Sequence, residues 1–428
     1  MADTSYHHVR AEAHEAPPGC PVNHEFTPLD PAYMADPYTM AKRFREESPV
    51  FYAEQFGYVV VTRMEDISEV FRDHETYSSE NVQDPVFPIG QQAQEILAAP
   101  DFDPIAVMSN RQPPDHGRIR KHTRQLFSVR RMKTLEPYIR RRCHELIDDM
   151  LEMEPPVDFV TAFTHPLSGE VIFRFIGFPE DMDTQLKAWT TDRLAFTWGK
   201  PSPEQQVDIA RKMLAYYRYC KEYTAYRDEH AGDDIATELL AAHHADPEDL
   251  TYREVVSVLY GLSFAGHEIV ANLFSNCLLT IQPGRADWDA LCADPALIPN
   301  AVEEVIRINS PQIGWRRVTT RATTLGGIDI PAGTQVFLYL GAANHQPSEF
   351  PDPETYDMHR DNARKNISFG KGIHLCLGAN LARLEGKVVL EVLTERLPGL
   401  RLVPDQEIER YPNLNFRGPR RLLITLDG

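Results

Sequence analysis

The spacing of hydrophobic and polar residues predicts a protein built mostly from helices. From residue 64 to residue 309 apolar side chains recur mainly at helical intervals, most clearly in residues 132–153 and in the long run 252–282. The earlier segment 50–62 is different, because aromatic and β-branched residues surround Gly57, a pattern typical of a β-hairpin. The hydrophobic pattern therefore predicts a helical body with a hairpin near its start.

Strand-like patterns return only late in the chain. Residues 335–339 and a segment near the C-terminus follow the turn-like sequence 326–333. No repeat, low-complexity tract or Gly/Ser linker divides the 428 residues. We therefore expect a mainly α fold with small β-sheets (α+β), in which residues 26–428 form a single large domain and the polar residues 1–25 form a flexible arm.

Charge and cysteine content exclude several classes of protein. The formal net charge of −19 disfavours binding to nucleic acid or to an anionic membrane, and no segment has the length and apolarity of a membrane span. The six cysteines lack the spacing of a disulfide framework or a zinc site, which indicates a reducing cytoplasm. One stretch is strongly basic, with a single acid, Glu136, among these residues: Arg118, Arg120, Lys121, Arg124, Arg130, Arg131, Lys133, Arg140, Arg141 and Arg142.

Cys376 is the residue with the clearest chemical signal. It follows a loop that contains Gly370 and Gly372 and directly precedes a helical pattern. Free backbone N–H groups and the helix dipole at such a helix start favour a thiolate, lower its pKa and make the sulfur a good ligand or nucleophile. The two glycines allow the backbone to curl close to the sulfur.

This segment resembles the haem-binding signature of the cytochrome P450 superfamily. Five positions of that signature match here, namely Phe369, Gly370, His374, Cys376 and Gly378. The resemblance implies the P450 fold, haem b as cofactor and Cys376 as the axial ligand of the iron. It extends over nearly the whole chain, from about Asp30 to the C-terminus.

Further family features follow in the expected order. Glu304 and Arg307 form a Glu-x-x-Arg pair one helical turn apart, and the resemblance implies that Arg360 completes it. Haem carries two propionates that need cationic or hydrogen-bonding partners. By resemblance, His116, Arg120, Arg317 and His374 supply them.

The segment that resembles the oxygen-activating helix departs from the family at one position. Ala265, Gly266 and Glu268 match, but Ile269 stands where relatives carry a threonine that helps to deliver protons, and isoleucine cannot relay a proton. Three interpretations remain open: proton delivery assisted by substrate or water with Glu268 contributing, use of peroxide as oxidant, or non-standard haem chemistry such as nitration or dehydration.

The resemblance implies a monooxygenase that uses O2 and NAD(P)H-derived electrons from a separate ferredoxin and reductase, since no flavin, nicotinamide or iron–sulfur motif is present. The basic stretch would suit docking of an acidic ferredoxin, or it is an ordinary solvated surface. Rival classes are a haem-thiolate sensor without turnover and a helical protein whose cysteine is structural.

The segments 20–26, 293–304, 315–318 and 414–419 resemble a bacterial subfamily that degrades thiocarbamate herbicides, some members of which carry a fused reductase. This favours a small, largely apolar substrate, aromatic or xenobiotic, undergoing hydroxylation or dealkylation. By family topology the substrate pocket would include Phe87, Met108, Phe196, Leu262, Ile313 and Phe416.

Overall fold

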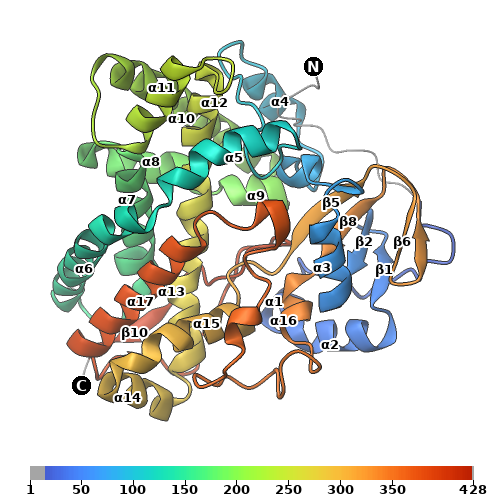
Figure 1. The fold of residues 1–428 in the computed structure, drawn as a ribbon. Helices are drawn as coiled ribbons and strands as arrows, with labels where there is room; N and C mark the ends of the chain where they lie inside the picture. Colours follow the sequence, from blue (N-terminus) through green and yellow to red (C-terminus); the bar gives the residue numbers. More distant parts are fainter. Residues whose placement is uncertain (1–14, 427–428) are drawn as a thin grey trace.

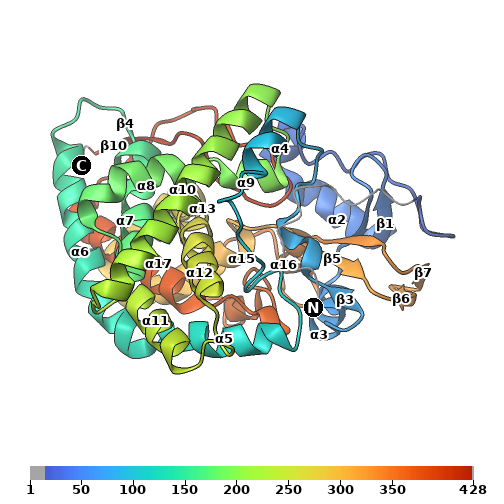
Figure 2. The same ribbon diagram turned by 90° about the horizontal axis from the view of Figure 1, so that it is seen from above.

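A computed structural model describes residues 15–426 and shows a helical body with small β-sheets on one side. In both views the strands of the larger sheet lie at one edge, while the long helices fill the rest of the molecule (Figures 1 and 2). The expected mainly α fold with small sheets is therefore confirmed.

The helices occupy most of the described chain. They are α1 (Pro31–Ala35), α2 (Pro37–Glu47), α3 (Met64–Arg72), α4 (Gln91–Leu97), α5 (Asp115–Leu126), α6 (Val129–Leu151), α7 (His165–Ile176), α8 (Asp183–Thr190), α9 (Arg193–Trp198), α10 (Pro203–Glu229), α11 (Ile235–Ala245), α12 (Tyr252–Gly266), α13 (Glu268–Ile281), α14 (Arg285–Ala293), α15 (Ile298–Ile308), α16 (Leu340–Asn344) and α17 (Ala379–Arg396). Within residues 15–426 none of them is long and apolar enough to span a membrane.

The larger sheet has five strands in the order β1-β2-β8-β5-β3, and it contains the predicted hairpin. Its strands are β1 (Val50–Ala53), β2 (Tyr58–Val61), β3 (Tyr77–Ser78), β5 (Trp315–Thr319) and β8 (Gln335–Leu338). Antiparallel pairing of Val50 with Val61 sets the register of β1 and β2, and β8 then runs parallel to β2. A three-stranded sheet joins β4 (Val157–Asp158), β10 (Leu423–Thr425) and β9 (Arg401–Leu402), and a two-stranded sheet joins β6 (Thr323–Leu325) and β7 (Ile328–Ile330).

The N-terminal segment is more ordered than expected. Residues 1–14 of the predicted flexible arm lie outside the described residues. Within the remainder, the Tyr52 N–H donates to the Pro21 carbonyl at 2.8 Å, the Asn23 N–H donates to the Tyr52 carbonyl at 2.9 Å, and Cys20 is buried. Residues 20–23 are thus held on β1 by backbone hydrogen bonds, and they do not form a free arm.

The long helix expected over residues 252–282 is divided in two. It begins at a capping box, in which Glu254 N–H bonds the Thr251 hydroxyl at 3.3 Å and Thr251 N–H bonds the Glu254 carboxylate at 2.8 Å. The helix is interrupted at His267, whose φ of −90° and ψ of −81° separate α12 from α13. A helical hydrophobic pattern does not reveal such a break, because the apolar positions on either side keep their spacing.

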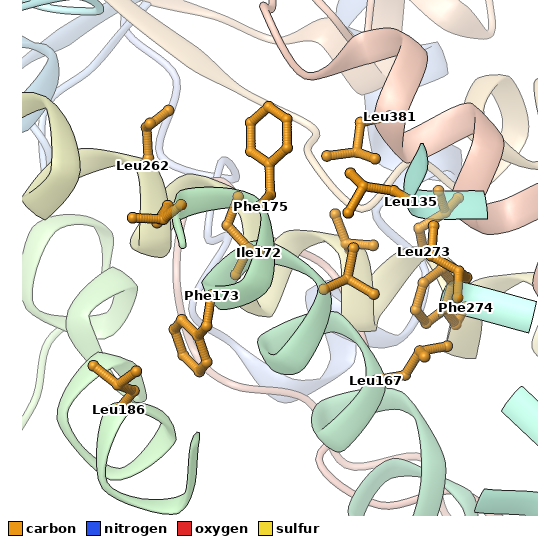
Figure 3. Close-up of a cluster of buried hydrophobic side chains, with 14 of the residues drawn as sticks. Leu135, Leu167, Ile172, Phe173, Phe175, Leu186, Leu262, Leu273, Phe274 and Leu381 are labelled. Atoms are coloured by element: carbon orange, nitrogen blue, oxygen red, sulfur yellow. The ribbon is translucent and has the colours of Figure 1, made fainter. Parts of the chain in front are cut away.

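In the main hydrophobic core α7 packs against α12 and α13, and α17 packs against α6 and α13. Figure 3 shows Ile172 and Phe175 of α7 together with Leu262 of α12, Leu273 of α13 and Leu381 of α17. The core therefore places the helix that follows Cys376 and the interrupted α12–α13 pair around a common space.

Candidate active site

A cavity opens between α12 and α13 on one side and the Cys376 segment on the other. Residues that line it include Met108, Leu262, Ala265, Ile269, Phe369, Cys376 and Phe416. The lining is mostly apolar, so the cavity favours a largely apolar occupant.

The loop before α17 bends so that Cys376 faces this cavity. Gly370 and Gly372 both have φ of +70°, and a Cβ on Gly372 would lie 2.5 Å from the Phe71 carbonyl oxygen. The Cys376 N–H donates to the Phe369 carbonyl at 3.0 Å. Both glycines are thus required by the backbone path, and Cys376 is accessible from within the cavity although protein surrounds the segment.

The electrostatics of Cys376 differ from the expectation for a cysteine at a helix start. Burial is the dominant effect and raises the pKa of its thiol, while the Gly378 N–H, Arg120, Arg383 and the Ala379 N–H act to lower that pKa. The expectation of a lowered pKa was therefore wrong, because desolvation outweighs the helix N-terminus. A sulfur in this position needs a further positive charge beside it to remain a thiolate, which is what a bound metal ion supplies.

Four buried or half-buried basic groups gather beside the cysteine without an acidic partner. The rings of His116 and His374 lie 4.2 Å apart between centroids, and neither His116 Nε2 nor His374 Nδ1 has a hydrogen-bond partner. Arg120 donates to the Leu375 carbonyl, and Arg317 donates to the Arg316 carbonyl at 2.6 Å. In the described chain neither guanidinium has a carboxylate within 4.0 Å.

The pKa values of these groups reflect the same shortage of negative charge. Burial lowers the pKa of Arg317 to about 9, that of His116 to about 4 and that of His374 to about 2. Buried cations and orphaned N–H groups without an anion are costly. The arrangement fits a dianionic ligand such as the two haem propionates, next to a sulfur that needs a cation.

The residues of the segment that resembles the oxygen-activating helix do not all face the cavity. Ala265, Gly266 and Ile269 line the cavity, whereas Glu268 does not. The Glu268 Oε1 accepts a hydrogen bond from the Asp192 N–H at 3.2 Å, and burial raises the pKa of its carboxyl to about 7. The structure therefore does not place this acid among the groups that face the cavity.

Gly266 lines the cavity, and close packing against α7 also leaves no space for a side chain at this position. A Cβ at this position would lie 2.6 Å from Ile172 Cγ1 of α7. Next to it, His267 is buried and its Nδ1 lies 3.0 Å from the Thr190 hydroxyl of α8. Close contacts with α7 and α8 thus hold the break between α12 and α13.

Glu304, Arg307 and Arg360 form one buried network. Arg307 Nε donates to Glu304 Oε2 and Arg307 Nη2 donates to Glu304 Oε1, both at 2.7 Å, and Arg360 Nε donates to Glu304 Oε1 at 2.9 Å. Arg307 also donates to the carbonyls of Asn344 and Pro353, and Arg360 donates to that of Pro351. The network ties α15 to the segment that leads to the Cys376 loop.

Of the residues expected in the substrate pocket, three line the cavity: Met108, Leu262 and Phe416. The other three do not. Phe87 packs against Phe56, with centroids 5.9 Å apart, Phe196 is buried in the main core, and Ile313 packs in the cluster next to the larger sheet. These three side chains pack against other apolar residues instead, and their positions in the sequence do not distinguish such packing from a place in the cavity wall.

Sequence reasoning missed Arg193, which lines the same cavity from the start of α9. An isolated arginine in a helical pattern carries no signal of this kind, because arginine is usually a surface residue.

The basic stretch between Arg118 and Arg142 is largely neutralised by acids from other elements. Arg118 pairs with Glu254 at 2.6 Å, Lys121 with Asp249 at 2.9 Å, and Arg142 with Glu170 at 2.6 Å. Arg131, Arg140 and Arg141 also have acidic partners. Much of this stretch therefore holds α5 and α6 to their neighbours and is not a free cationic surface.

Comparison with known proteins agrees with this geometry. The family model named Cytochrome P450 matches residues 292–409. Cytochrome P450 107B1 of Saccharopolyspora erythraea is 32% identical over 404 residues, covering 92% of this chain and 96% of the relative. The 6-deoxyerythronolide B hydroxylase of the same organism is 34% identical over 325 residues, covering 75% of this chain and 78% of the relative.

Solved structures give the same result. Cytochrome P450 CREJ in complex with (4-ethylphenyl) dihydrogen phosphate superimposes with a TM-score of 0.90 at 38% identity, covering 94% of this chain and 99% of that one. An intact type IV self-sufficient cytochrome P450 monooxygenase superimposes with a TM-score of 0.92 at 34% identity, covering 96% of this chain and 54% of that one. The chain belongs to the cytochrome P450 family of monooxygenases, whose members bind haem b.

Proposed function

We propose that this P450 inserts one atom of O2 into a small, largely apolar substrate, aromatic or xenobiotic in character, by hydroxylation or oxidative dealkylation. The observation that carries the proposal is the Cys376 thiol facing an apolar cavity beside four basic groups without an anion. The similarity to CREJ, whose structure holds an alkylphenyl phosphate, supports an aromatic substrate.

In this proposal Cys376 would hold the haem iron through its sulfur, and His116, Arg120, Arg317 and His374 would hold the propionates. The bound haem would supply O2 activation and oxidising power, while the protein would position the substrate, exclude water and deliver protons. Met108, Leu262 and Phe416 form apolar walls of the cavity and would position the substrate in it.

Proton delivery is proposed to depend on ordered water or on the substrate itself. Ile269 lines the cavity and offers no hydroxyl, and Glu268 is turned toward the Asp192 N–H. An Ile269→Thr variant should therefore give more product per NAD(P)H consumed. Unchanged coupling would mean that proton delivery bypasses this position. Peroxide-driven or non-standard chemistry would be favoured if hydrogen peroxide alone supported turnover at the rate of the complete system.

Electrons are proposed to come from a separate ferredoxin and its NAD(P)H-dependent reductase. With much of the basic stretch paired internally, the docking surface would centre on the exposed Leu375, whose carbonyl accepts a hydrogen bond from Arg120. Arg124 is near Arg120, and Arg72 is near Lys371 of the same loop. Arg124→Glu and Arg72→Glu should each raise the KM for ferredoxin, more so at low salt. An equal charge change on α10, Arg211→Glu, should leave that KM unchanged.

The proposed reaction is tested by reconstitution. Purified protein, a surrogate ferredoxin and reductase, and NAD(P)H under ¹⁸O₂ should convert alkylbenzenes to alcohols that carry one labelled oxygen. With 4-alkylphenyl ethers the labelled oxygen should leave in the released aldehyde, while the phenol keeps the unlabelled ether oxygen. A haem spectrum without substrate-dependent NAD(P)H consumption across a broad panel, with competent partners, would favour a sensor instead.

A further inference from the structure

Arg193 is a buried cation that lines the cavity from α9. It is the first residue of α9, its exposed fraction is 4%, and it is part of the cavity lining. The residues that surround the proposed propionates lie on α5, on β5 and in the loop before α17, so Arg193 belongs to a different wall.

The guanidinium of Arg193 has few partners. It donates to the Thr197 hydroxyl one turn along the same helix, and its Nε has no hydrogen-bond acceptor. Across residues 15–426 no carboxylate oxygen lies within 4.0 Å of it. Five N–H donors thus face one neutral acceptor, and burying a cation in this way is unfavourable unless an anion joins it.

The nearby acids are engaged elsewhere. Asp192 lies 3.5 Å from Lys212 Nζ, and Glu268 accepts from the Asp192 N–H. Glu268 contributes only a weaker, longer-range attraction, and burial raises its pKa to about 7, so near neutral pH it is only partly ionised. Neither acid compensates the Arg193 charge at contact distance.

Two aromatic rings fix the direction of the guanidinium. Its Cζ lies 5.7 Å from the centroid of Phe264 on α12 and 6.0 Å from that of Phe196 on α9. Such contacts orient an arginine and stabilise it modestly, but they provide no hydrogen-bond acceptor. The site is therefore preorganised for a small planar or tetrahedral anion that accepts two hydrogen bonds.

We infer that Arg193 binds an anionic group of the substrate, a carboxylate or a phosphate monoester, while the apolar body of the substrate extends toward Leu262 and Ile269. This rests on the proposed monooxygenase function and narrows its substrate class to anionic amphiphiles. The substrate charge would anchor one end of the molecule and thereby determine which carbon is oxidised.

The test is a binding titration of the haem-loaded protein, followed by the substrate-induced shift of the Soret band. The probes are 4-butylbenzoate and 4-butylphenyl phosphate, with 4-butylbenzamide as the neutral analogue of similar shape. We expect at least one anion to bind about 10-fold more tightly than the amide, and Arg193→Gln to weaken that anion about 10-fold, as for a lost charged hydrogen bond. Amide binding should change little in the variant.

Controls separate this from misfolding and from failure of the proposed function. Lys200→Gln, which alters an exposed cation near Phe87, should leave all affinities unchanged, and Arg193→Gln should keep the carbon-monoxide spectrum of the parent. If Arg193→Gln weakens the binding of both anions, the site accepts anions in general. If it weakens only one, that probe identifies the substrate class as a carboxylate or a phosphate monoester. Equal affinity for anions and amide, or no effect of Arg193→Gln on any anion, overturns the inference. If the inference fails but neutral substrates are oxidised, the proposed monooxygenase function still holds. If anions bind in an Arg193-dependent way but no substrate is oxidised, the anion site holds and the proposed function fails.

Discussion

The Glu268 Oε1 accepts a hydrogen bond from the backbone N–H of Asp192 at 3.2 Å, which connects the start of α13 to the start of α9. Asp192 has φ of +70°, an uncommon conformation for a residue other than glycine. The carboxyl of Glu268 thus stabilises the turn that directs Arg193 into the cavity.

Burial of the Glu268 carboxyl, which the Asp192 N–H only partly offsets, predicts a specific pH dependence of stability. Burial raises the pKa of Glu268 to about 7, above its ordinary value of 4.5. The stability that depends on a neutral Glu268 is fully present below about pH 4.5, where this carboxyl is protonated in both the folded and the unfolded protein. It is lost as the pH rises to about 7, because over this range the carboxyl ionises freely only in the unfolded protein. The parent protein should lose about 1–3 kcal/mol of its free energy of unfolding between pH 5 and pH 8 through this carboxyl, and Glu268→Gln should abolish that loss. Thermal unfolding of both proteins across this range measures it, and parallel curves would refute the assignment.

The contact between Gly266 and Ile172 predicts a cost for adding one methyl group. Gly266→Ala would place Cβ 2.6 Å from Ile172 Cγ1 and should destabilise the haem-bound protein by about 1–3 kcal/mol. Gly261→Ala lies in the same helix with nothing within 4 Å of the new Cβ, and it should be neutral or stabilising by about 0.5–1 kcal/mol. Equal melting temperatures for the two variants would show that Ile172 or α7 moves to accommodate the added methyl group at little cost.

The Glu304 network predicts unequal effects for two arginines in the same loop. Arg360→Ala removes one of the two guanidinium partners of the buried Glu304 and should cost about 3–5 kcal/mol, with poor haem retention. Arg364, whose side chain is 73% exposed, pairs with Glu303 at 3.0 Å, and Arg364→Ala should cost no more than about 1 kcal/mol. Denaturant unfolding of the two variants distinguishes them, and similar losses would contradict the network as the main link between α15 and the loop.

Local patterns in the sequence predicted the parts of the molecule that depend on local chemistry. The hairpin around Gly57 and the glycine loop before Cys376 follow from residue types within a few positions, because turn geometry and helix starts are short-range properties. The assembly of His116, Arg317 and His374 could be expected only by resemblance, since these residues come from three distant segments.

Properties set by long-range packing were not predictable. The break at His267 depends on contacts with α7 and α8, and the pairing of Arg118 with Glu254 joins residues that are 136 positions apart. The exclusion of Phe87, Phe196 and Ile313 from the cavity, and the inclusion of Arg193, likewise depend on which face of each element points inward. Burial reversed even the expected pKa shift of Cys376.

The central claim is that Cys376 binds the haem iron as a thiolate, and the reduced, carbon-monoxide-bound difference spectrum tests it most directly. We predict a strongly red-shifted Soret band for the parent protein and for Cys292→Ala, a partly buried cysteine on α14. Cys376→Ala should lose the shift. An unshifted band in the parent protein, or a shifted band that survives in Cys376→Ala, would contradict the account.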